Sequence, residues 1–170
     1  MPLPALVWRA LELARVDFAP RYRQPPALRV VVATFVSVAG SLLADALLVV
    51  IGTAAFPSTR GYAHFQFFDY AKLTIVGVLI ACAAWPVVTR VSSSPRWLFF
   101  RLAILVTLVL YLPDLYLLVV GQSVTAVAVL MLMHLAIAVV TYNVLVHLAG
   151  VGKTLTPARH GAHRQSATID

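Results

Sequence analysis

The sequence has few charged residues: only 11% of its 170 residues are Asp, Glu, Lys or Arg, whereas 61% are hydrophobic. A soluble domain keeps about a quarter of its residues charged. A chain with so little charge cannot build the polar shell that such a domain presents to water. The scarcity of charge therefore excludes an ordinary soluble domain and predicts an integral membrane protein.

Cysteine is also scarce, and the patterns typical of catalytic and metal sites are missing. Cys82 is the single cysteine, so it cannot form a disulfide within the chain, and we expect it to fill space as a small apolar side chain. The sequence shows no ligand spacing typical of a structural metal site and no nucleotide-binding fingerprint. We therefore expect no metal, no cofactor and no catalytic residues.

The chain has instead four long apolar blocks. A membrane-spanning helix needs about 20 predominantly apolar residues, and a helix satisfies its own backbone hydrogen bonds inside lipid. The blocks cover residues 27–51, 71–88, 97–120 and 123–149. The sequence therefore predicts an all-α fold, an integral membrane four-helix bundle over residues 27–149.

The segments outside the blocks differ in composition. Residues 1–26 combine Arg and Glu with leucine and aromatic residues, which indicates a short amphipathic helix at the cytoplasmic interface, an anchor or alternatively a docking site for a partner. Residues 150–170 are polar and basic, and we expect a flexible cytoplasmic tail. The long first connection, 52–70, is rich in aromatic residues. It is typical of an interfacial belt or a cap on the bundle, and alternatively of an entrance for a lipid or small molecule.

The basic residues are distributed unevenly. Of the 13 Lys and Arg residues, only Arg60 and Lys72 lie in the first connection or directly after it, and the others lie near the two termini or around the second connection. Such an excess marks the cytoplasmic side of a multi-pass protein, so both termini are predicted to be cytoplasmic. The expected partners are membrane lipids and, as further options, a membrane protein or a second copy of the chain. Nucleic acid is not an expected partner.

Three ionisable residues lie well inside the apolar blocks, away from the block ends: Asp45, Asp114 and His134. A charged group within a span costs at least about 2.5–3.5 kcal/mol, so such residues usually face the interior of a bundle. Counting 1.5 Å per residue places all three in the outer half of the bundle. Tyr111 precedes Asp114 by three residues and shares its helix face. The pattern predicts a polar pocket formed by Asp45, Tyr111, Asp114 and His134.

Small residues precede Asp45 at intervals of four. Ala33, Ser37 and Ser41 lie on one face of the first predicted helix, where small side chains let helices approach closely. We predict that this face packs inside the bundle. Two structural interpretations of the pocket residues also remain open. Asp114 and His134 can serve only to pair neighbouring helices, and Asp45 can extend to the outer interface.

A family resemblance rests on the Pro113–Asp114 pair, the Met133–His134 pair and the basic turn before residue 97. With these features the chain resembles a family of small four-span bacterial integral membrane proteins of unknown function, over residues 28–149. The resemblance implies a four-helix bundle in the bacterial cell membrane and implies no activity.

These observations favour a non-enzymatic accessory protein, or a bundle that binds a lipid or small molecule. Two alternatives remain open. One is a small proton-coupled transporter that uses Asp45, Asp114 and His134. The other is an intramembrane lipid-modifying enzyme in which His134 acts as the base and Asp114 orients it.

Overall fold

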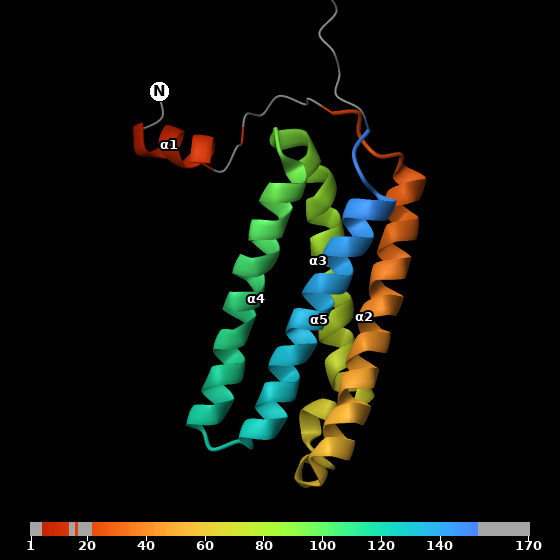
Figure 1. The fold of residues 1–170 in the computed structure, drawn as a ribbon, viewed down its shortest axis with the longest axis vertical. Coiled ribbons are helices and arrows are strands. Elements are labelled where there is room, and N and C mark those ends of the chain that lie inside the picture. The colour runs from red at the N-terminus through yellow and green to blue at the C-terminus, as the bar shows by residue number, and fades with distance from the viewer. Residues whose placement is uncertain (1–4, 14–15, 17–21, 153–170) are drawn as a thin grey trace, which may run out of the picture.

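The fold is an all-α bundle, seen in a computed structural model that describes residues 5–13, 16 and 22–152. Four long helices alternate in direction: α2 (Ala27–Ala55), α3 (Phe67–Val91), α4 (Pro95–Val119) and α5 (Val124–Leu148) (Figure 1). Each is long and apolar enough to cross a membrane. The bundle predicted from the sequence is confirmed, and α2 and α3 extend a few residues beyond the predicted blocks.

Proline and glycine mark the boundaries of these helices. Pro26 precedes α2, and Pro95 is the first residue of α4, a position where the missing N–H of proline costs nothing. Between α4 and α5, Gly121 has φ 85°, a left-handed conformation that a residue with a Cβ seldom adopts. The chain therefore reverses within a few residues, and α4 and α5 form an antiparallel hairpin.

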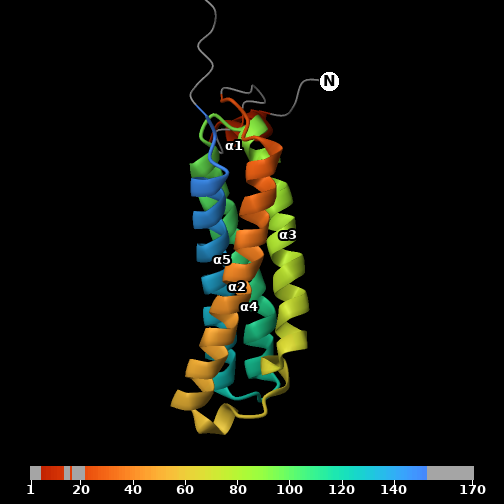
Figure 2. The ribbon, with the colours of Figure 1, turned by 90° about the vertical axis from the view of Figure 1, so that its right-hand side faces the viewer.

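The two ends of the bundle are formed by different segments of the chain. The terminal end carries the start of α2 and the end of α5. The loop end carries the α2–α3 connection and the α4–α5 turn (Figures 1 and 2). The short helix α1 (Ala5–Leu13) lies across the bundle axis at the terminal end. The predicted amphipathic segment thus contains a helix, while residues 153–170 of the predicted tail lie outside the described residues.

The terminal end is closed by an apolar cluster to which all four long helices contribute, here called the terminal core. Trp85 of α3 is fully buried and donates a 2.8 Å hydrogen bond from Nε1 to the carbonyl of Ala149. Its ring meets Phe99 of α4 edge-on at 5.0 Å. The members of the cluster are Ala33, Val78, Cys82, Trp85, Val88, Phe99, Leu145, Val146 and Ala149.

Hydrogen bonds add to this closure. Gln24 and Thr89 bond reciprocally, because the Gln24 amide donates to the Thr89 carbonyl at 3.2 Å and the Thr89 hydroxyl donates to Gln24 Oε1 at 2.7 Å. The Gly152 N–H donates to the carbonyl of Arg23 at 2.9 Å. The segment before α2 is therefore held against α3 and against the chain that follows α5.

The loop end is covered by a second apolar cluster, here called the loop core. Its members are Phe65, Tyr70, Ala71, Ala126, Val129 and Met133. Phe65 belongs to the short helix η2 (Ala63–Phe65), which follows η1 (Pro57–Thr59) in the α2–α3 connection. The predicted cap is therefore present: the connection folds back onto α3 and α5. Among the described residues, α4 contributes no member to this cluster.

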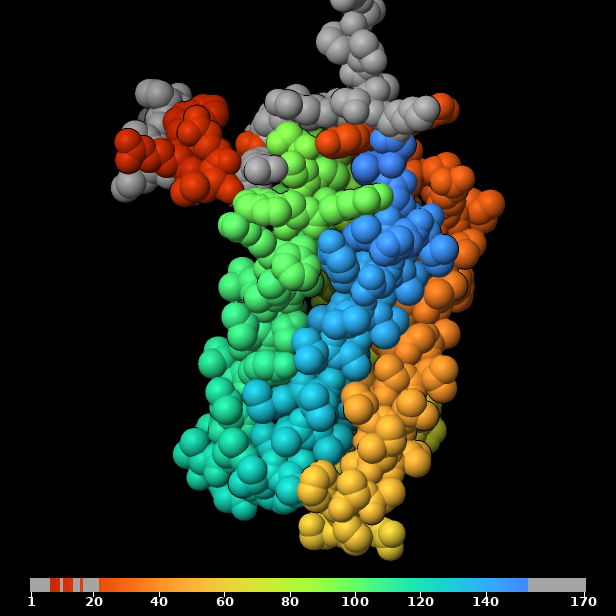
Figure 3. Space-filling model, viewed as in Figure 1, coloured from red at the N-terminus to blue at the C-terminus, as the bar shows by residue number. Residues whose placement is uncertain are grey.

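Helix α5 is the central helix of the bundle. It packs most extensively against α2, then against α4, and it also contacts α3. The space-filling view shows α5 lying between α4 and α2 on one face (Figure 3). Helix α4 packs mainly against α5 and only slightly against α3, and the two diverge from their shared turn toward the loop end (Figure 1). The side between α3 and α4 is therefore the least closely packed side of the bundle.

Candidate functional site

The buried polar groups gather between the terminal core and the loop core. We call Asp45, Thr74, Tyr111, Asp114 and His134 the polar layer; all four long helices contribute to it. At 1.5 Å per residue, Asp114 lies about 8 Å from the end of α4, and His134 lies about 15 Å from the start of α5. The layer is therefore well inside the spanning helices, in the half nearer the loop end.

Asp114 and His134 are in direct contact across the α4–α5 hairpin. His134 Nδ1 lies 3.0 Å from Asp114 Oδ2, yet the two atoms are not aligned as a hydrogen bond and neither has a hydrogen-bond partner in the protein. The contact is therefore a close polar contact that becomes an ion pair when His134 is protonated. The ring of Tyr111 meets the imidazole edge-on, with centroids 6.5 Å apart. Three of the four predicted pocket residues thus lie together.

Asp45 is fully buried and pairs with a residue that the sequence did not point out. The hydroxyl of Thr74 in α3 donates to Asp45 Oδ2 at 2.7 Å. The other carboxylate oxygen, Oδ1, has no hydrogen-bond partner. His134 is close enough to act on Asp45 electrostatically. Asp45 therefore faces the same layer without touching the Asp114–His134 pair, and it does not extend to the outer interface.

The α2–α3 connection covers the layer from the loop end. Burial raises the pKa of Tyr62 above its ordinary value, and the carboxylate of Asp114 raises it further. The Tyr62 hydroxyl is buried without a hydrogen-bond partner, and its ring meets Phe65 edge-on at 5.2 Å. Tyr62 thus places a hydroxyl within electrostatic reach of Asp114 while its ring packs with the loop core.

The small-residue face of α2 is buried as predicted. Ala33, Ser37 and Ser41 are completely inaccessible, like Asp45 on the same face. Helix α2 approaches α5 closely at two glycines, where an added Cβ would lie 2.8 Å from Val129 at Gly52 and 3.1 Å from Val140 at Gly40. We did not predict these two contacts, because glycine leaves no side-chain periodicity to follow.

Several polar atoms in and around the layer have no hydrogen-bond partner among the described residues. A buried polar group without a partner costs about 1–3 kcal/mol, so native proteins contain few of them. Here they concentrate near the loop-end half of the bundle and along α2. The atoms are Ser37 Oγ, Ser41 Oγ, Asp45 Oδ1, Tyr62 OH, Asp114 Oδ2, His134 Nδ1 and Thr141 Oγ1.

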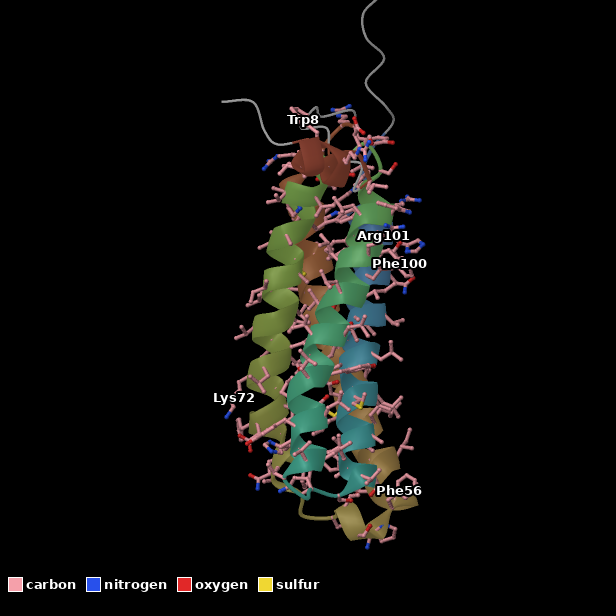
Figure 4. All side chains as sticks on the ribbon, turned by 90° about the vertical axis from the view of Figure 1, so that its left-hand side faces the viewer. Trp8, Phe56, Lys72, Phe100 and Arg101 are labelled. Carbon is pink, nitrogen blue, oxygen red and sulfur yellow. The ribbon has the colours of Figure 1, made fainter. Side chains whose placement is uncertain are left out.

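The chemistry of the layer is that of an acidic site. The layer contains two carboxylates and one imidazole, and α5 contains no Lys or Arg. Lys72 of α3 pairs with Asp69 at 2.8 Å, and Figure 4 shows Lys72 pointing outward. Within the described ranges, no three His, Cys, Asp or Glu side chains lie close enough together to hold a metal ion. Such a layer can accept hydrogen bonds, bind a cation or exchange protons.

Thr74 and Tyr62 are the two residues at the site that the sequence does not single out, and only Thr74 has a weak signal in the sequence. Thr74, Val78 and Cys82 recur every four residues and are all buried in α3, so the inward face of this helix is visible in retrospect. Tyr62 carried no such signal. It stands in an irregular connection, and only the folding of that connection onto α3 and α5 places it beside the layer.

The fold and the polar layer together define an all-α, multi-pass membrane protein with ionisable groups buried between its helices. A family profile matches residues 19–150, and the chain belongs to that family, a family of unknown function (DUF6069). The match covers slightly more of the chain than the resemblance read from the sequence. No curated protein and no solved structure matches the chain.

Proposed function

We propose that this protein is a non-enzymatic bundle that binds a small molecule or a lipid in its polar layer, alone or as the accessory of a partner in the same membrane. The observation that carries the proposal is the set of buried polar atoms without partners around Asp45, Asp114 and His134. A ligand that bonds to these atoms would recover the free energy that their burial costs.

Helix pairing alone explains the layer less well. A polar contact that serves only to hold helices together gains most when its donors and acceptors are satisfied. In this layer Asp45 uses one oxygen, and the Asp114–His134 contact lacks hydrogen-bond alignment. Because the same groups lie across four helices and not at one interface, they are better arranged to surround a ligand than to join two helices.

Native mass spectrometry of the full chain, extracted in mild detergent, tests the proposal. Wild type is compared with His134→Leu and with His147→Leu, a matched control in the same helix. His147 is exposed near the end of α5, where its Nδ1 lies 2.8 Å from the carbonyl oxygen of Asn143. We expect an added mass on wild type and on His147→Leu that is missing from His134→Leu.

The outcomes separate binding from folding. Thermal unfolding of the three proteins in the same detergent checks that His134→Leu still assembles. If it does not, His134→Gln, which keeps a polar side chain of similar size, replaces it in the comparison. Wild type without any added mass, or with the same added mass in every variant, would overturn the proposal.

Proton-coupled transport is the second candidate. It is favoured by the 26% exposure of the His134 side chain in the middle of a spanning helix, beside Asp114, because ionisable residues at this depth often relay protons. Proteoliposomes that contain a pH-sensitive dye test it. Transport predicts a proton flux that His134→Leu abolishes and His147→Leu retains, and a flux equal to that of empty liposomes would exclude it.

We further propose that the protein resides in a bacterial cell membrane with both termini in the cytoplasm. The basic residues support this orientation, because Arg23, Arg29, Arg90, Arg96 and Arg101 all lie at or near the terminal end, and Figure 4 shows Arg101 toward that end and Lys72 toward the other. A reporter that is active only outside the cytoplasm, fused after residue 170, should be silent. The same reporter inserted after Arg60 should be active, and the reverse pattern would refute the orientation.

A further inference from the structure

We propose that the ligand of the polar layer is a cationic amphiphile, a protonated amine attached to a hydrocarbon chain, which enters from the lipid between α3 and α4. The inference rests on the proposed binding function and specifies the class of ligand. Its two parts, the charge of the head and the lateral route, rest on different observations.

The charge follows from the titratable groups that face the layer. Asp45 and Asp114 supply two carboxylates, His134 is the imidazole among them, and His64 of the α2–α3 connection is within electrostatic reach of Asp114. The layer therefore has a net charge of −1 or −2 when both carboxylates are ionised, depending on the state of His134. Arg60 is exposed in the α2–α3 connection, the other described arginines lie at or near the terminal end, and Lys72 is already paired with Asp69.

The free hydrogen-bonding atoms favour the same class of ligand. When ionised, Asp45 Oδ1 and Asp114 Oδ2 can accept hydrogen bonds but cannot donate them. Asp45 Oδ1 has no partner among the described residues, Asp114 Oδ2 lies 3.0 Å from His134 Nδ1, and the buried hydroxyls of Ser41 and Tyr62 can also accept. An ammonium group carries three donors and no acceptor, and its bonds to carboxylates are charge-assisted. An anionic head would meet two carboxylates at close range, and a neutral hydroxyl head would leave their charge uncompensated.

The lateral route is inferred from the two apolar clusters that close the layer toward the two ends of the bundle. The terminal core, with Trp85 and Leu145 fully buried, closes one side. The loop core and the α2–α3 connection cover the other. Only the α3–α4 side is lightly packed, because α4 diverges there and adds no residue to the loop core.

The partial exposure of His134 indicates that the layer is not fully sealed from the side of the bundle. Its side chain is 26% exposed, although it lies about ten residues inside α5, whereas the side chain of Asp114 is only 7% exposed. At that depth the surroundings of a spanning helix are hydrocarbon and not water. A ligand that reaches the imidazole from the side must therefore have an apolar chain that remains in the lipid.

The probe is dodecylamine, titrated into nanodiscs of phosphatidylcholine that contain the full chain. Dodecanol and dodecanoate have chains of the same length with a neutral and an anionic head, and empty nanodiscs correct for partition into lipid. We expect the amine to bind at least tenfold more tightly than either analogue. Asp45→Asn and Asp114→Asn should each weaken amine binding by about tenfold or more, because each substitution removes a charge-assisted hydrogen bond to the ammonium group.

The control substitution is Asp69→Asn, which removes the carboxylate that pairs with Lys72 near the loop end, outside the layer. It should leave amine binding unchanged. Asparagine retains the volume of aspartate and an oxygen that can accept from Thr74, so the test variants are expected to fold; unfolding curves measured in the same nanodiscs check this. Equal binding of the three amphiphiles, or equal losses in all three variants, would overturn the charge assignment.

The route is tested with dodecylamine that carries a diazirine in its chain. After illumination, adducts on α3 and α4 that excess dodecylamine suppresses would support lateral entry between these helices, whereas adducts confined to α2 would overturn it. The tests also separate this inference from the binding function. An added mass that His134→Leu removes, together with equal binding of amine and alcohol, would leave the binding function standing and refute the cationic ligand.

Discussion

The contact between Gly52 and Val129 gives the sharpest stability prediction for this bundle. A Cβ added at Gly52 would lie 2.8 Å from one Val129 methyl and 3.3 Å from the other, whereas carbon atoms in contact are normally about 3.5–4.0 Å apart. Valine in a helix has one strongly preferred rotamer, so its methyls cannot turn away. We therefore expect Gly52→Ala to push α2 and α5 apart.

The magnitude follows from a matched comparison. Overpacking of this kind costs about 1–3 kcal/mol, but alanine also regains up to about 1 kcal/mol over glycine within a helix. Gly77 in α3 serves as the control, because a Cβ there would meet nothing within 4 Å. Both substitutions replace glycine with alanine within a helix and so gain the same helix-propensity contribution. The difference in unfolding free energy between Gly52→Ala and Gly77→Ala therefore isolates the steric cost of about 1–3 kcal/mol.

The assay is equilibrium unfolding of the full chain in mixed micelles of a non-ionic detergent and dodecyl sulfate, followed by circular dichroism. Val129→Ala in the Gly52→Ala background should restore part of the loss, with a coupling energy of about 0.5–3 kcal/mol. A Gly52→Ala protein that is as stable as Gly77→Ala would refute the close approach of α2 to α5.

Two further substitutions test the terminal core and the polar layer by the same assay. Trp85→Phe removes the hydrogen bond to the Ala149 carbonyl and should lower stability by about 1 kcal/mol, well below the roughly 3–5 kcal/mol expected for Trp85→Ala; equal losses would contradict a role for the indole N–H. Thr74→Val leaves Asp45 without its donor and should cost about 1–3 kcal/mol. Thr74→Ser should recover most of that loss, and a failure to do so would show that the threonine methyl, not its hydroxyl, matters.

The sequence predicts the spanning helices because their signal is local and strong. About 20 consecutive apolar residues define a spanning helix whatever its neighbours are, and the positions of Ala33, Ser37, Ser41 and Asp45 reveal a buried face by their spacing alone. The face shared by Tyr111 and Asp114 follows from the same kind of spacing, and Asp114 is buried. Periodicity within one helix thus identifies which side turns inward.

Partnerships between helices are not encoded locally. Asp45 and Thr74 are 29 residues apart, and nothing in either segment specifies their relative rotation or depth. That relation depends on how closely α2 approaches α5, which is set by Gly40 and Gly52 against Val140 and Val129. The sequence therefore predicted that Asp45 turns inward, and only the packed bundle gives its partner.

The order of the layers along the bundle gives a physical reason why one half is packed less tightly than the other. The terminal core involves all four helices, and its aromatic contacts and the Trp85 hydrogen bond hold α4 in place there. Toward the loop end the apolar contacts are made by α2, α3, α5 and the α2–α3 connection. Helix α4 is then held chiefly by α5, where Asp114 and Tyr111 meet His134. A small outward movement of α4 would therefore open the polar layer to lipid without disturbing the terminal core.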